Sequence, residues 1–340
     1  MQTTPATPES IAASARCLRA GGLVAFATET VYGLGANALD ASAVARIFEA
    51  KGRPAHNPLI VHVADEDAAR QVVSAWPDQA QRLAQAFWPG PLTLVLPRAA
   101  NIPGLITAGL GSVGVRVPAH PVALELLRQA RLPIAAPSAN RSEALSPTRA
   151  EHVRLSLGAF LNPQRDIILD GGDCAVGIES TVLDLTQAPA LLLRPGAVSR
   201  ARIEAVIGPI HVLDAPSCAA PGHGAPQISP GLAARHYAPR ARALRFDSRA
   251  ELQAALALRG GCKYLHRLGV VTVGDFPLAD PTHIEAHALP GGPEGYASGL
   301  YATLHALDDA GCAEIWIEMP PEHEEWRAVR DRLRRATVRG

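Results

Sequence analysis

The sequence predicts an α/β protein with two domains, in which a twisted mixed sheet with flanking helices precedes a smaller Rossmann-like α/β domain. The chain has 340 residues, which is more than one typical domain holds. Short apolar runs typical of strands alternate with helical patterns along most of it. A stretch rich in proline and glycine, residues 208–240, separates residues 1–207 from residues 241–340, and we expect it to be a linker or lid without packed elements.

In the first domain, the ends of two helices are marked by capping residues. Thr7 is a candidate N-cap, and Pro8 suits the first helical position. Asp40 caps a second helix, which Gly52 can end. Further helices are expected over 80–87, 121–129 and 148–156, and strands over 23–26, 58–63, 92–96, 113–117, 133–136, 167–169 and 181–183. Several of these strands are close enough in sequence to form hairpins, so the sheet should be mixed.

The last hundred or so residues show a simpler alternation of strand and helix. Strands are expected over 243–246, 270–273 and 315–317, and helices over 249–258, 294–310 and 324–336. Such a βα order predicts a small parallel sheet. Tyr301, Asp308, Asp331 and Arg332 lie in this region, where we expect each to have a structural role.

Composition limits the classes of protein that fit. Hydrophobic residues make up 48% and charged residues 19%, as in globular proteins. Acidic and basic residues number 32 each, whereas tight non-specific nucleic-acid binding usually requires a basic excess. The five cysteines are scattered without metal-ligand spacing, which indicates reduced thiols. We see no signal peptide and no apolar run long enough to span a membrane, so we expect a cytoplasmic protein.

Familiar nucleotide-binding motifs do not explain the first domain. No GxxxxGK[ST] pattern occurs, which excludes a P-loop enzyme. Residues 33–38 resemble a degenerate dinucleotide fingerprint, but five residues separate them from the preceding strand, and no acidic residue follows at the expected distance. We therefore interpret this run as something other than a dinucleotide-binding turn.

Cations and small polar residues instead follow several strands and one helix. Lys51 and Arg53 can be read as a basic helix end, or as cations that hold phosphates. Ser138 and Asn140 follow an apolar strand, where they can reach a ligand, whereas Ser146 can also serve as a turn or N-cap residue.

Two further arginines belong to this pattern. Arg194 lies at a strand end, and Ser180 precedes another strand in the run Glu179-Ser180-Thr181. Arg116 lies within an apolar strand, where an unpaired cation would be costly. It needs an anionic partner, which can be a carboxylate of the protein or one of a ligand.

Taken together, these segments closely resemble the threonylcarbamoyl-adenylate synthase family over residues 10–200. The matching segments are Thr28-Glu29-Thr30-Val31-Tyr32-Gly33-Leu34, Lys51-Gly52-Arg53, Asn57-Pro58-Leu59, Trp88-Pro89-Gly90-Pro91-Leu92-Thr93, Arg116-Val117-Pro118, Pro137-Ser138-Ala139-Asn140 and Glu179-Ser180-Thr181-Val182. Ser229-Pro230-Gly231 and His236-Tyr237-Ala238-Pro239 look like the linker of its long form, in which a YrdC-like catalytic domain precedes a C-terminal domain. One position departs from the family, which usually has glycine where this chain has Glu143, and glycine there often supplies a positive φ.

The resemblance implies a nucleotidyltransferase. Such an enzyme makes L-threonylcarbamoyl-AMP and pyrophosphate from L-threonine, bicarbonate or CO2, and ATP, which is the first step of threonylcarbamoyladenosine modification beside the tRNA anticodon. The product would pass to a downstream tRNA threonylcarbamoyl transferase complex. Mg2+ would accompany ATP on its phosphate oxygens, without a metal site made by the protein.

The resemblance also assigns roles to residues. Lys51 and Arg53 would be catalytic, in the sense that they neutralise charge on the phosphates. The implied ATP-binding residues are Lys51, Arg53, Asn57, Ser112, Ser138, Asn140, Ser146, Arg194 and Tyr237. The implied threonine-binding residues are Thr30, Tyr32, His62, Arg116, Ala136 and Ser180. Tyr237 would fold over ATP as a lid. Two alternatives remain at this point, an RNA-binding module and an enzyme that transfers a carbamoyl group to another acceptor.

Overall fold

The computed structural model describes residues 1–213, 230–231, 236–260, 266–276 and 283–340. They form two units. The first comprises Met1–Ser142 with Ser146–Ala233, and the second comprises Glu143–Leu145 with Ala234–Gly340. Much of the predicted linker, including Ser229, together with Cys218 and Cys262, lies outside the described residues. Within the described part, no helix is long and apolar enough to cross a membrane.

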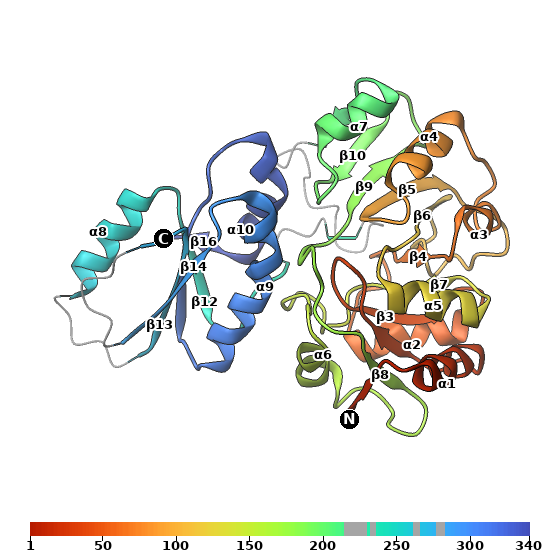
Figure 1. The fold of residues 1–340 in the computed structure, drawn as a ribbon, viewed down its shortest axis with the longest axis horizontal. Helices are drawn as coiled ribbons and strands as arrows, with labels where there is room; N and C mark the ends of the chain where they lie inside the picture. Colours follow the sequence, from red (N-terminus) through yellow and green to blue (C-terminus); the bar gives the residue numbers. More distant parts are fainter. Residues whose placement is uncertain (214–229, 232–235, 261–265, 277–282) are drawn as a thin grey trace. The chain divides into compact units, whose positions relative to one another are not determined.

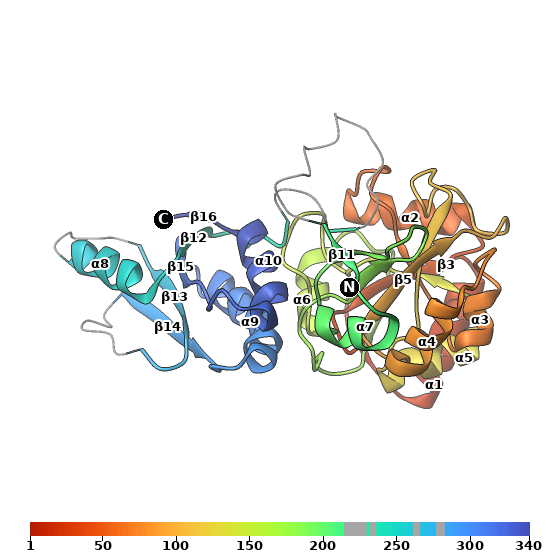
Figure 2. The ribbon, with the colours of Figure 1, turned by 90° about the horizontal axis from the view of Figure 1, so that it is seen from above.

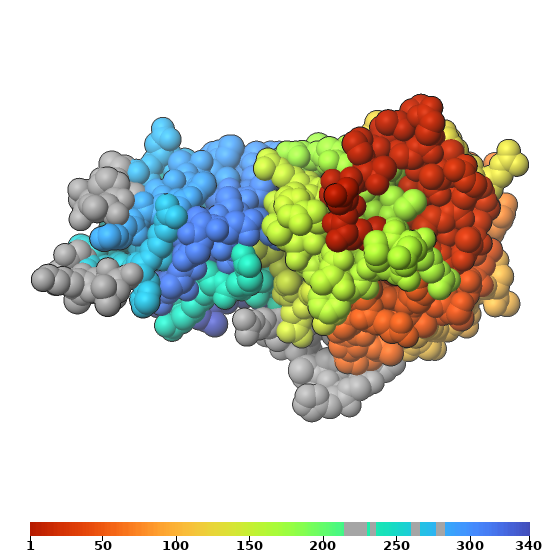
Figure 3. All heavy atoms as spheres, turned by 90° about the horizontal axis from the view of Figure 1, so that it is seen from below, coloured from red at the N-terminus to blue at the C-terminus, as the bar shows by residue number. Residues whose placement is uncertain are grey.

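The first unit is built on one mixed sheet (Figure 1). From edge to edge, its strands are β1 (Thr3–Pro5), β8 (Ile167–Asp170), β2 (Val24–Phe26), β3 (Gly33–Asn37), β7 (Ile134–Ala135), β4 (Ile60–His62), β6 (Ser112–Arg116), β5 (Leu92–Pro97), β9 (Thr181–Asp184), β10 (Leu191–Arg194) and β11 (His211–Val212). β2 and β3, β5 and β6, and β9 and β10 are antiparallel, so the sheet is mixed, as predicted. The N-terminal strand β1 lies beside β8, and Figure 3 shows the red N-terminal residues against the green segment that contains β8.

Helices cover the two faces of this sheet unequally. They are α1 (Pro8–Arg19), α2 (Ala41–Lys51), α3 (Glu66–Arg70), α4 (Asp78–Phe87), α5 (Pro121–Ala130), α6 (Ala150–Leu157) and α7 (Arg200–Ile207). The main core joins the apolar sides of α2, α3, α4, α6 and α7 to one face. α1 and α5 pack on the other face, over β2 and β7. Figure 2 shows α2 on one side of β3 and both α1 and α5 on the other.

The helix ends follow the sequence signals. Thr7 and Ser10 form a capping box at α1, with Pro8 in the first turn. The Asp40 side chain accepts two main-chain N–H bonds at the start of α2, and Gly52 ends that helix with a φ of 60°. The N-cap prediction for Ser146 is wrong, because α6 begins at Ala150 without a side-chain cap.

The glycine-rich run over residues 33–38 is a strand, in agreement with the rejection of the dinucleotide motif. A Cβ atom on Gly35 would lie 2.7 Å from Ile134 Cγ2 and 2.8 Å from Phe26 Cε1. Glycine is therefore required at this position because β3 packs closely against Phe26 and Ile134. The run is a strand and not the turn that holds a pyrophosphate.

The second unit contains a parallel sheet, as the βα order predicts. Its strands, in spatial order, are β14 (Ile284–Leu289), β13 (Leu268–Val273), β15 (Glu314–Glu318), β12 (Arg242–Phe246) and β16 (Val338–Arg339). Every described pair of neighbours is parallel. The accompanying helices are α8 (Arg249–Gly260), α9 (Pro293–Asp309), the short 3-10 helix η2 (Glu324–Trp326) and α10 (Arg327–Ala336).

Several elements differ from the sequence prediction. The strands β1, β3, β14 and β16 and the helices α3 and α7 were not predicted. The predicted helix over 324–336 begins with the 3-10 turn. The expectation that residues 208–240 lack packed elements is wrong at both ends, because β11 pairs with β10, and His236 and Tyr237 are buried.

Candidate active site

One face of the first sheet carries the predicted binding residues His62, Ser112 and Arg116, and we call it the site face. Cross-strand pairing places His62 opposite Arg116 and Thr93 opposite Val182. Paired residues point to the same side of a sheet, and successive residues alternate. The opposite face is therefore the one that carries Val61, Val115, Leu94 and Leu183 into the main core.

The site face is apolar at its two ends and polar between them. At one end, α1 and α5 cover Phe26, Ile134 and Ala136. At the other, Val95, Val182 and Leu193 form a small apolar cluster. The predicted threonine-binding residue Ala136 thus lies at the border of the helix-covered part, next to the polar strands β4 and β6.

A β-bulge turns Arg194 toward this face. Leu192 pairs with Leu183, but the next pair is Arg194 with Val182, so Leu193 and Arg194 oppose a single residue. The Arg194 guanidinium then donates to the main-chain oxygen of Ser180 at 3.1 Å, to its hydroxyl at 3.2 Å, and to the Pro230 carbonyl at 3.2 Å. The Ser180 hydroxyl also lies 2.8 Å from that of Thr93, so β5, β9 and β10 are joined by one polar network.

Arg116 has the anionic partner that its apolar strand requires. Its Nη2 lies 2.5 Å from Glu29 Oε1, and both side chains are largely buried. Nη1 donates to the Thr30 hydroxyl at 2.9 Å, and Nε to the Gly90 carbonyl at 3.1 Å. The other Glu29 oxygen accepts the Ala119 N–H at 3.0 Å. Of the two partners that the sequence left open, the described structure contains the protein carboxylate.

His62 lies beside Arg116 and is neutral at ordinary pH. Its ring meets Phe26 edge-on, with 6.3 Å between ring centroids. Burial, together with the positive charge of Arg116, lowers the pKa of His62 from 6.5 to about 3. A neutral imidazole can accept a hydrogen bond from a ligand ammonium or hydroxyl group.

Lys51 ends α2 and reaches the loop that follows β7. Its Nζ donates to the Ser138 carbonyl at 2.6 Å and also to the Asn140 carbonyl. Burial lowers the pKa of Lys51 well below 10.5, and the nearby cations Arg53 and Arg141 add to this effect. An anion bound here would be attracted to three positive groups together.

Arg53 is held by the turn that precedes β4. Its Nη2 donates to Asn57 Oδ1 at 2.5 Å and to the Pro58 carbonyl at 2.8 Å, and its Nε donates to the Asn57 carbonyl at 3.1 Å. The interpretation of this segment as a helix end and its interpretation as a cation site are compatible, because Gly52 caps α2 while the flanking cations point into the domain.

The loop between β7 and α6 supplies the remaining polar residues. The Asn140 side chain donates to the Arg141 carbonyl at 2.8 Å. The Ser146 hydroxyl donates to Glu179 Oε1 at 2.5 Å, which joins this loop to the segment before β9. One chain segment thus carries Ser138, Asn140 and Ser146. Lys51 binds its beginning through the Ser138 carbonyl, and Glu179 binds its end through the Ser146 hydroxyl.

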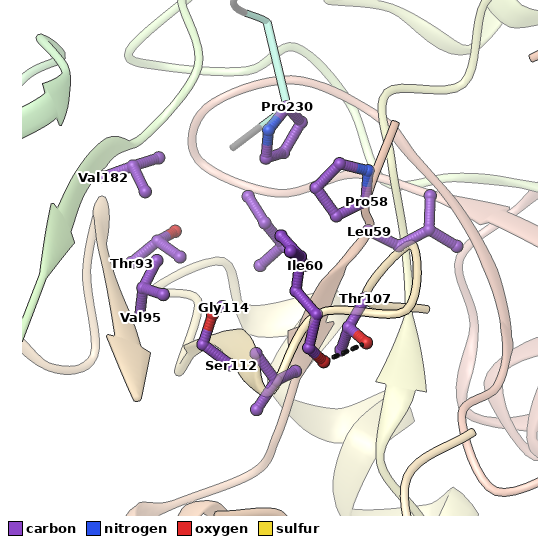
Figure 4. Close-up of a pocket in the computed structure, with 12 residues that line it drawn as sticks. Pro58, Leu59, Ile60, Thr93, Val95, Thr107, Ser112, Gly114, Val182 and Pro230 are labelled. Carbon is purple, nitrogen blue, oxygen red and sulfur yellow. Dashed lines mark hydrogen bonds between the residues drawn. The ribbon is translucent and has the colours of Figure 1, made fainter. Parts of the chain in front are cut away.

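A pocket opens on the site face between β4, β6, β5 and β9 (Figure 4). Its lining includes Ser112 and Gly114 of β6 and Thr93 and Val95 of β5. Pro230, which lies in the segment between β11 and β12, also lines it. Its full lining is Pro58, Leu59, Ile60, Thr93, Val95, Thr107, Leu110, Ser112, Val113, Gly114, Val182 and Pro230. Of the predicted nucleotide contacts, Ser112 lines it directly, and Asn57 immediately precedes its wall at Pro58.

Two predicted residues belong to other parts of the structure, Tyr32 to the main core and Tyr237 to the second unit. The Tyr32 side chain is in the main core, and its hydroxyl donates to the Gly172 carbonyl at 2.8 Å. Tyr237 belongs to the second unit, where its ring lies 5.9 Å from that of Tyr301 and 5.3 Å from the Arg332 guanidinium. Tyr301 and Arg332 thus pack within the second unit, consistent with the structural roles expected for them.

Sequence reasoning left four residues of this site without a role. Glu29, Thr93 and Glu179 are partners of Arg116, Ser180 and Ser146, respectively. Arg141 lies near Lys51, and its guanidinium stacks 4.2 Å from the Phe160 ring centroid. A signal existed for Glu29, because a carboxylate in the same polar run as Thr30 was available to the buried arginine.

The residues described do not group three or more His, Cys, Asp or Glu side chains in a way that could hold a metal ion. The carboxylates at the site, Glu29 and Glu179, are engaged by Arg116 and Ser146. Fold and site together define an α/β enzyme that gathers buried cations and neutral hydrogen-bonding groups on and beside one sheet face.

Comparison with known proteins extends over both units. Residues 16–196 match a family described as "Telomere recombination", and residues 198–338 match the "Threonylcarbamoyl-AMP synthase, C-terminal domain" family. A threonylcarbamoyl-AMP synthase of Pyrococcus abyssi is 43% identical and aligns over 94% of this chain and 92% of its own. One from Bacillus subtilis is 41% identical, over 96% and 92%. The crystal structure of P. abyssi Sua5 complexed with L-threonine superposes with a TM-score of 0.88 at 41% identity, covering 98% of this chain and 96% of that one.

The chain therefore belongs to the threonylcarbamoyl-AMP synthase family, in its long form with a C-terminal domain. Membership makes it an enzyme, a nucleotidyltransferase of tRNA modification.

Proposed function

We propose that the chain makes L-threonylcarbamoyl-AMP and pyrophosphate from L-threonine, bicarbonate or CO2, and ATP. The product would supply a downstream tRNA threonylcarbamoyl transferase complex. The observation that carries the proposal is the burial of four cations, Lys51, Arg53, Arg116 and Arg194, within the first unit. Several cations in one domain attract anions together, and the substrates supply a triphosphate and a carboxylate.

The reaction requires mainly positioning and charge neutralisation. The threonine amine takes up CO2 and loses a proton, which gives a carbamate. A carbamate oxygen then attacks the α-phosphorus of ATP, and the bond from that phosphorus to the bridging oxygen breaks as pyrophosphate leaves. Charge builds on the phosphate oxygens during this displacement, so fixed cations lower its barrier.

Lys51, Arg53 and Arg194 would bind the triphosphate. Lys51 is a point charge whose ammonium form would be restored by an adjacent anion, because the anion opposes the burial that lowers its pKa. Arg53 and Arg194 can each offer a planar guanidinium. The uncharged ATP contacts would be Asn57, Ser112, Ser138, Asn140 and Ser146.

Threonine would bind over β4 and β6. Arg116, which Glu29 and Thr30 hold in place, would meet its carboxylate, and neutral His62 would accept a hydrogen bond from its hydroxyl or amine. Ser180, Thr30 and Ala136 would complete this end of the site, and Tyr32 as a wall stays a prediction.

Mg2+ would accompany ATP and neutralise charge on its phosphates. Because Glu29 and Glu179 are already engaged, the donors would be phosphate oxygens and water. The lid role of Tyr237 is part of the proposal, with the high burial and positive φ of 62° at this residue as its only structural support.

Pyrophosphate release tests the proposal. Release from ATP should require both threonine and bicarbonate, and an Arg53→Gln variant should lose most of it while keeping its far-UV circular dichroism. Arg149→Gln is the matched control, because Arg149 is an exposed arginine paired with exposed Asp173. Release without bicarbonate, or none at all, would contradict the proposal.

The same measurements separate the two alternatives. Tight tRNA binding without ATP turnover would favour the RNA-binding module. Pyrophosphate release that depends on a carbamoyl donor other than threonine carbamate would favour transfer to another acceptor. Net charge of zero over the chain weighs against the RNA-binding module.

A further inference from the structure

The parallel sheet of the second unit has a topological switch point. β12 and β15 are parallel neighbours. After β12 the chain enters α8, and after β15 it enters η2 and α10. Figure 1 shows α8 on one side of β12 and both α9 and α10 on the other. When adjacent parallel strands lead to helices on opposite faces, a crevice forms at their carboxyl ends, and ligands of open α/β sheets bind in such crevices.

A cavity of about 510 Å³ lies at this crevice. Asp247 follows β12, Val273 ends β13, and Glu318 ends β15, so the lining comes from the carboxyl ends of three neighbouring strands. The remaining lining is Met319, Pro320, Pro321, Glu322, Arg330 and Arg334. The volume lies within the range of small-molecule sites, about 300–1,000 Å³.

Two of the carboxylates that line the cavity, Asp247 and Glu318, are paired with arginines that do not line it. Glu318 is bound by Arg249, with its two oxygens 3.0 and 3.1 Å from the guanidinium, and it also accepts the Val273 N–H. Asp247 lies 3.3 Å from Arg339. These two carboxylates are therefore already paired.

Arg330 and Arg334 share one exposed carboxylate oxygen. They lie one turn apart on α10 and contact Glu322 Oε1 at 3.1 and 3.0 Å. The Glu322 side chain is 79% exposed, whereas that of Arg330 is only 12% exposed. An exposed carboxylate contributes little to such a pair, and a phosphoryl group offers more acceptors to two guanidinium groups. A phosphoryl group could therefore displace the Glu322 carboxylate from the two guanidinium groups.

We propose that this cavity is a second ligand site, which binds a small molecule through a phosphoryl group held by Arg330 and Arg334. The remaining volume accommodates the rest of the molecule against Met319 and Pro320. The turn after β12, Phe246-Asp247-Ser248-Arg249, lacks the glycines of a dinucleotide-binding loop, so the phosphoryl group is recognised by side chains of α10. The site belongs wholly to the second unit.

The chain provides a local probe for this site. It contains two methionines, Met1 and Met319, and Met319 lines the cavity. In the full-length protein labelled with methyl-13C methionine, titration with inorganic phosphate, pyrophosphate or AMP should shift the Met319 methyl signal saturably. The Met1 signal is the internal reference, and Met319→Leu assigns the two. If phosphate and AMP have the same half-saturating concentration, the site binds inorganic anions. If AMP has the lower half-saturating concentration, the site binds a nucleotide.

Three variants make the test specific. Arg330→Gln/Arg334→Gln should raise the half-saturating concentration at least about 10-fold, because both charge-assisted contacts are lost. Glu322→Gln should lower it by about 3- to 10-fold, because the competing carboxylate is removed. The control Arg242→Gln/Arg267→Gln removes two exposed arginines at the amino ends of β12 and β13, the ends opposite the cavity, and should change the half-saturating concentration less than about 2-fold. The proposal would be overturned if no probe shifted the Met319 signal, or if the shift survived Arg330→Gln/Arg334→Gln. It would also be overturned if Glu322→Gln bound the probe no more tightly, or if the control pair weakened binding equally.

Discussion

The guanidinium of Arg116 lies 2.5 Å from the carboxylate of Glu29, and both side chains are largely buried. Glu29 is fixed in turn by the Ala119 N–H, and Arg116 by Thr30 and Gly90. The pair therefore fixes the direction of the arginine at the end of β6 before any ligand arrives. Pre-organisation of this kind lowers the entropy that substrate binding must overcome.

Loss of Glu29 should destabilise the first unit strongly. In Glu29→Ala, Arg116 keeps its charge in a buried position without its carboxylate, at a cost of about 3–5 kcal/mol in the free energy of unfolding. The double variant Glu29→Ala/Arg116→Met should recover part of this loss, because the stranded charge is gone. Chemical denaturation followed by circular dichroism measures both. Asp173→Ala, which breaks an exposed pair with Arg149, should cost less than about 1 kcal/mol. Equal losses in Glu29→Ala and Asp173→Ala would mean that the buried pair has no special weight.

His62 should make the stability of the first unit fall in mild acid. Its pKa is lowered from 6.5 to about 3 in the folded state, so below pH 6.5 the unfolded chain binds a proton that the folded chain does not. The stabilisation is complete above pH 6.5 and is lost as the pH falls toward 3, with a limiting slope of about 1.4 kcal/mol per pH unit. Between pH 6.5 and 3, His62→Gln should lower the slope of the unfolding free energy against pH by the amount that one bound proton contributes, about 1.4 kcal/mol per pH unit. Identical slopes in the two proteins would show that His62 titrates normally.

Much of the first unit could be predicted because its signals are local. β2 is a short, fully buried apolar run, and α1 carries its own capping residues. β1 was missed because its three residues are held by pairing with β8, more than 160 positions away. β14 was missed because its residues Ile284–Leu289 alternate with Glu and His and are mostly half-buried or exposed, so the run lacks the continuous apolar character of a buried parallel strand.

The residue types of the site were predictable, but their contacts were not. Arg116 required an anion by its position alone, yet the identity of Glu29 depends on how the segment after β2 folds back on β6. Arg194 reaches the site face through a bulge that alternation in the sequence does not reveal. The Ser146 hydroxyl looked like a helix cap and instead binds Glu179. Each of these contacts is long-range, and local patterns carry no information about its partner.

ATP binding should be coupled to proton uptake at Lys51. Burial lowers the pKa of its amine well below 10.5, so as the pH rises this lysine loses its proton before an exposed lysine does. Triphosphate beside Nζ favours the ammonium form, so binding should take up a fraction of a proton. Calorimetric titration of ATP in buffers with different ionisation enthalpies measures this fraction. It should vanish in Lys51→Met and persist in Arg149→Gln. Proton release, or uptake that Lys51→Met leaves intact, would refute the coupling.

Glu143 occupies a backbone conformation that suits glycine. Its φ is 69°, which places a side chain in the left-handed region. The positive φ that glycine often supplies here is therefore kept, although the chain carries Glu. Its carbonyl accepts the Ala238 N–H at 3.0 Å within the second unit, which keeps the conformation in place. Glu143→Gly should therefore stabilise the protein by up to about 1 kcal/mol. Thermal unfolding measures the gain, and Glu143→Ala should show none, because it keeps a Cβ atom. A Glu143→Gly protein that melts well below the parent would contradict this.

Gly196 should be essential to the geometry around Ser180. A Cβ atom at this position would lie 2.3 Å from the Thr181 nitrogen and 2.6 Å from the Ser180 carbonyl carbon, and both are backbone atoms that cannot turn aside. Gly196→Ala should push the start of β9 away from β10, and so separate Ser180 from Arg194 and Thr93. Pyrophosphate release should fall at least about 10-fold, since a displacement of about 1 Å at a positioning group can cost 100-fold. Gly104→Ala is the matched control, because nothing lies within 4 Å of the added atom. Normal turnover in Gly196→Ala would mean that the Ser180–Arg194 contact does not limit the reaction.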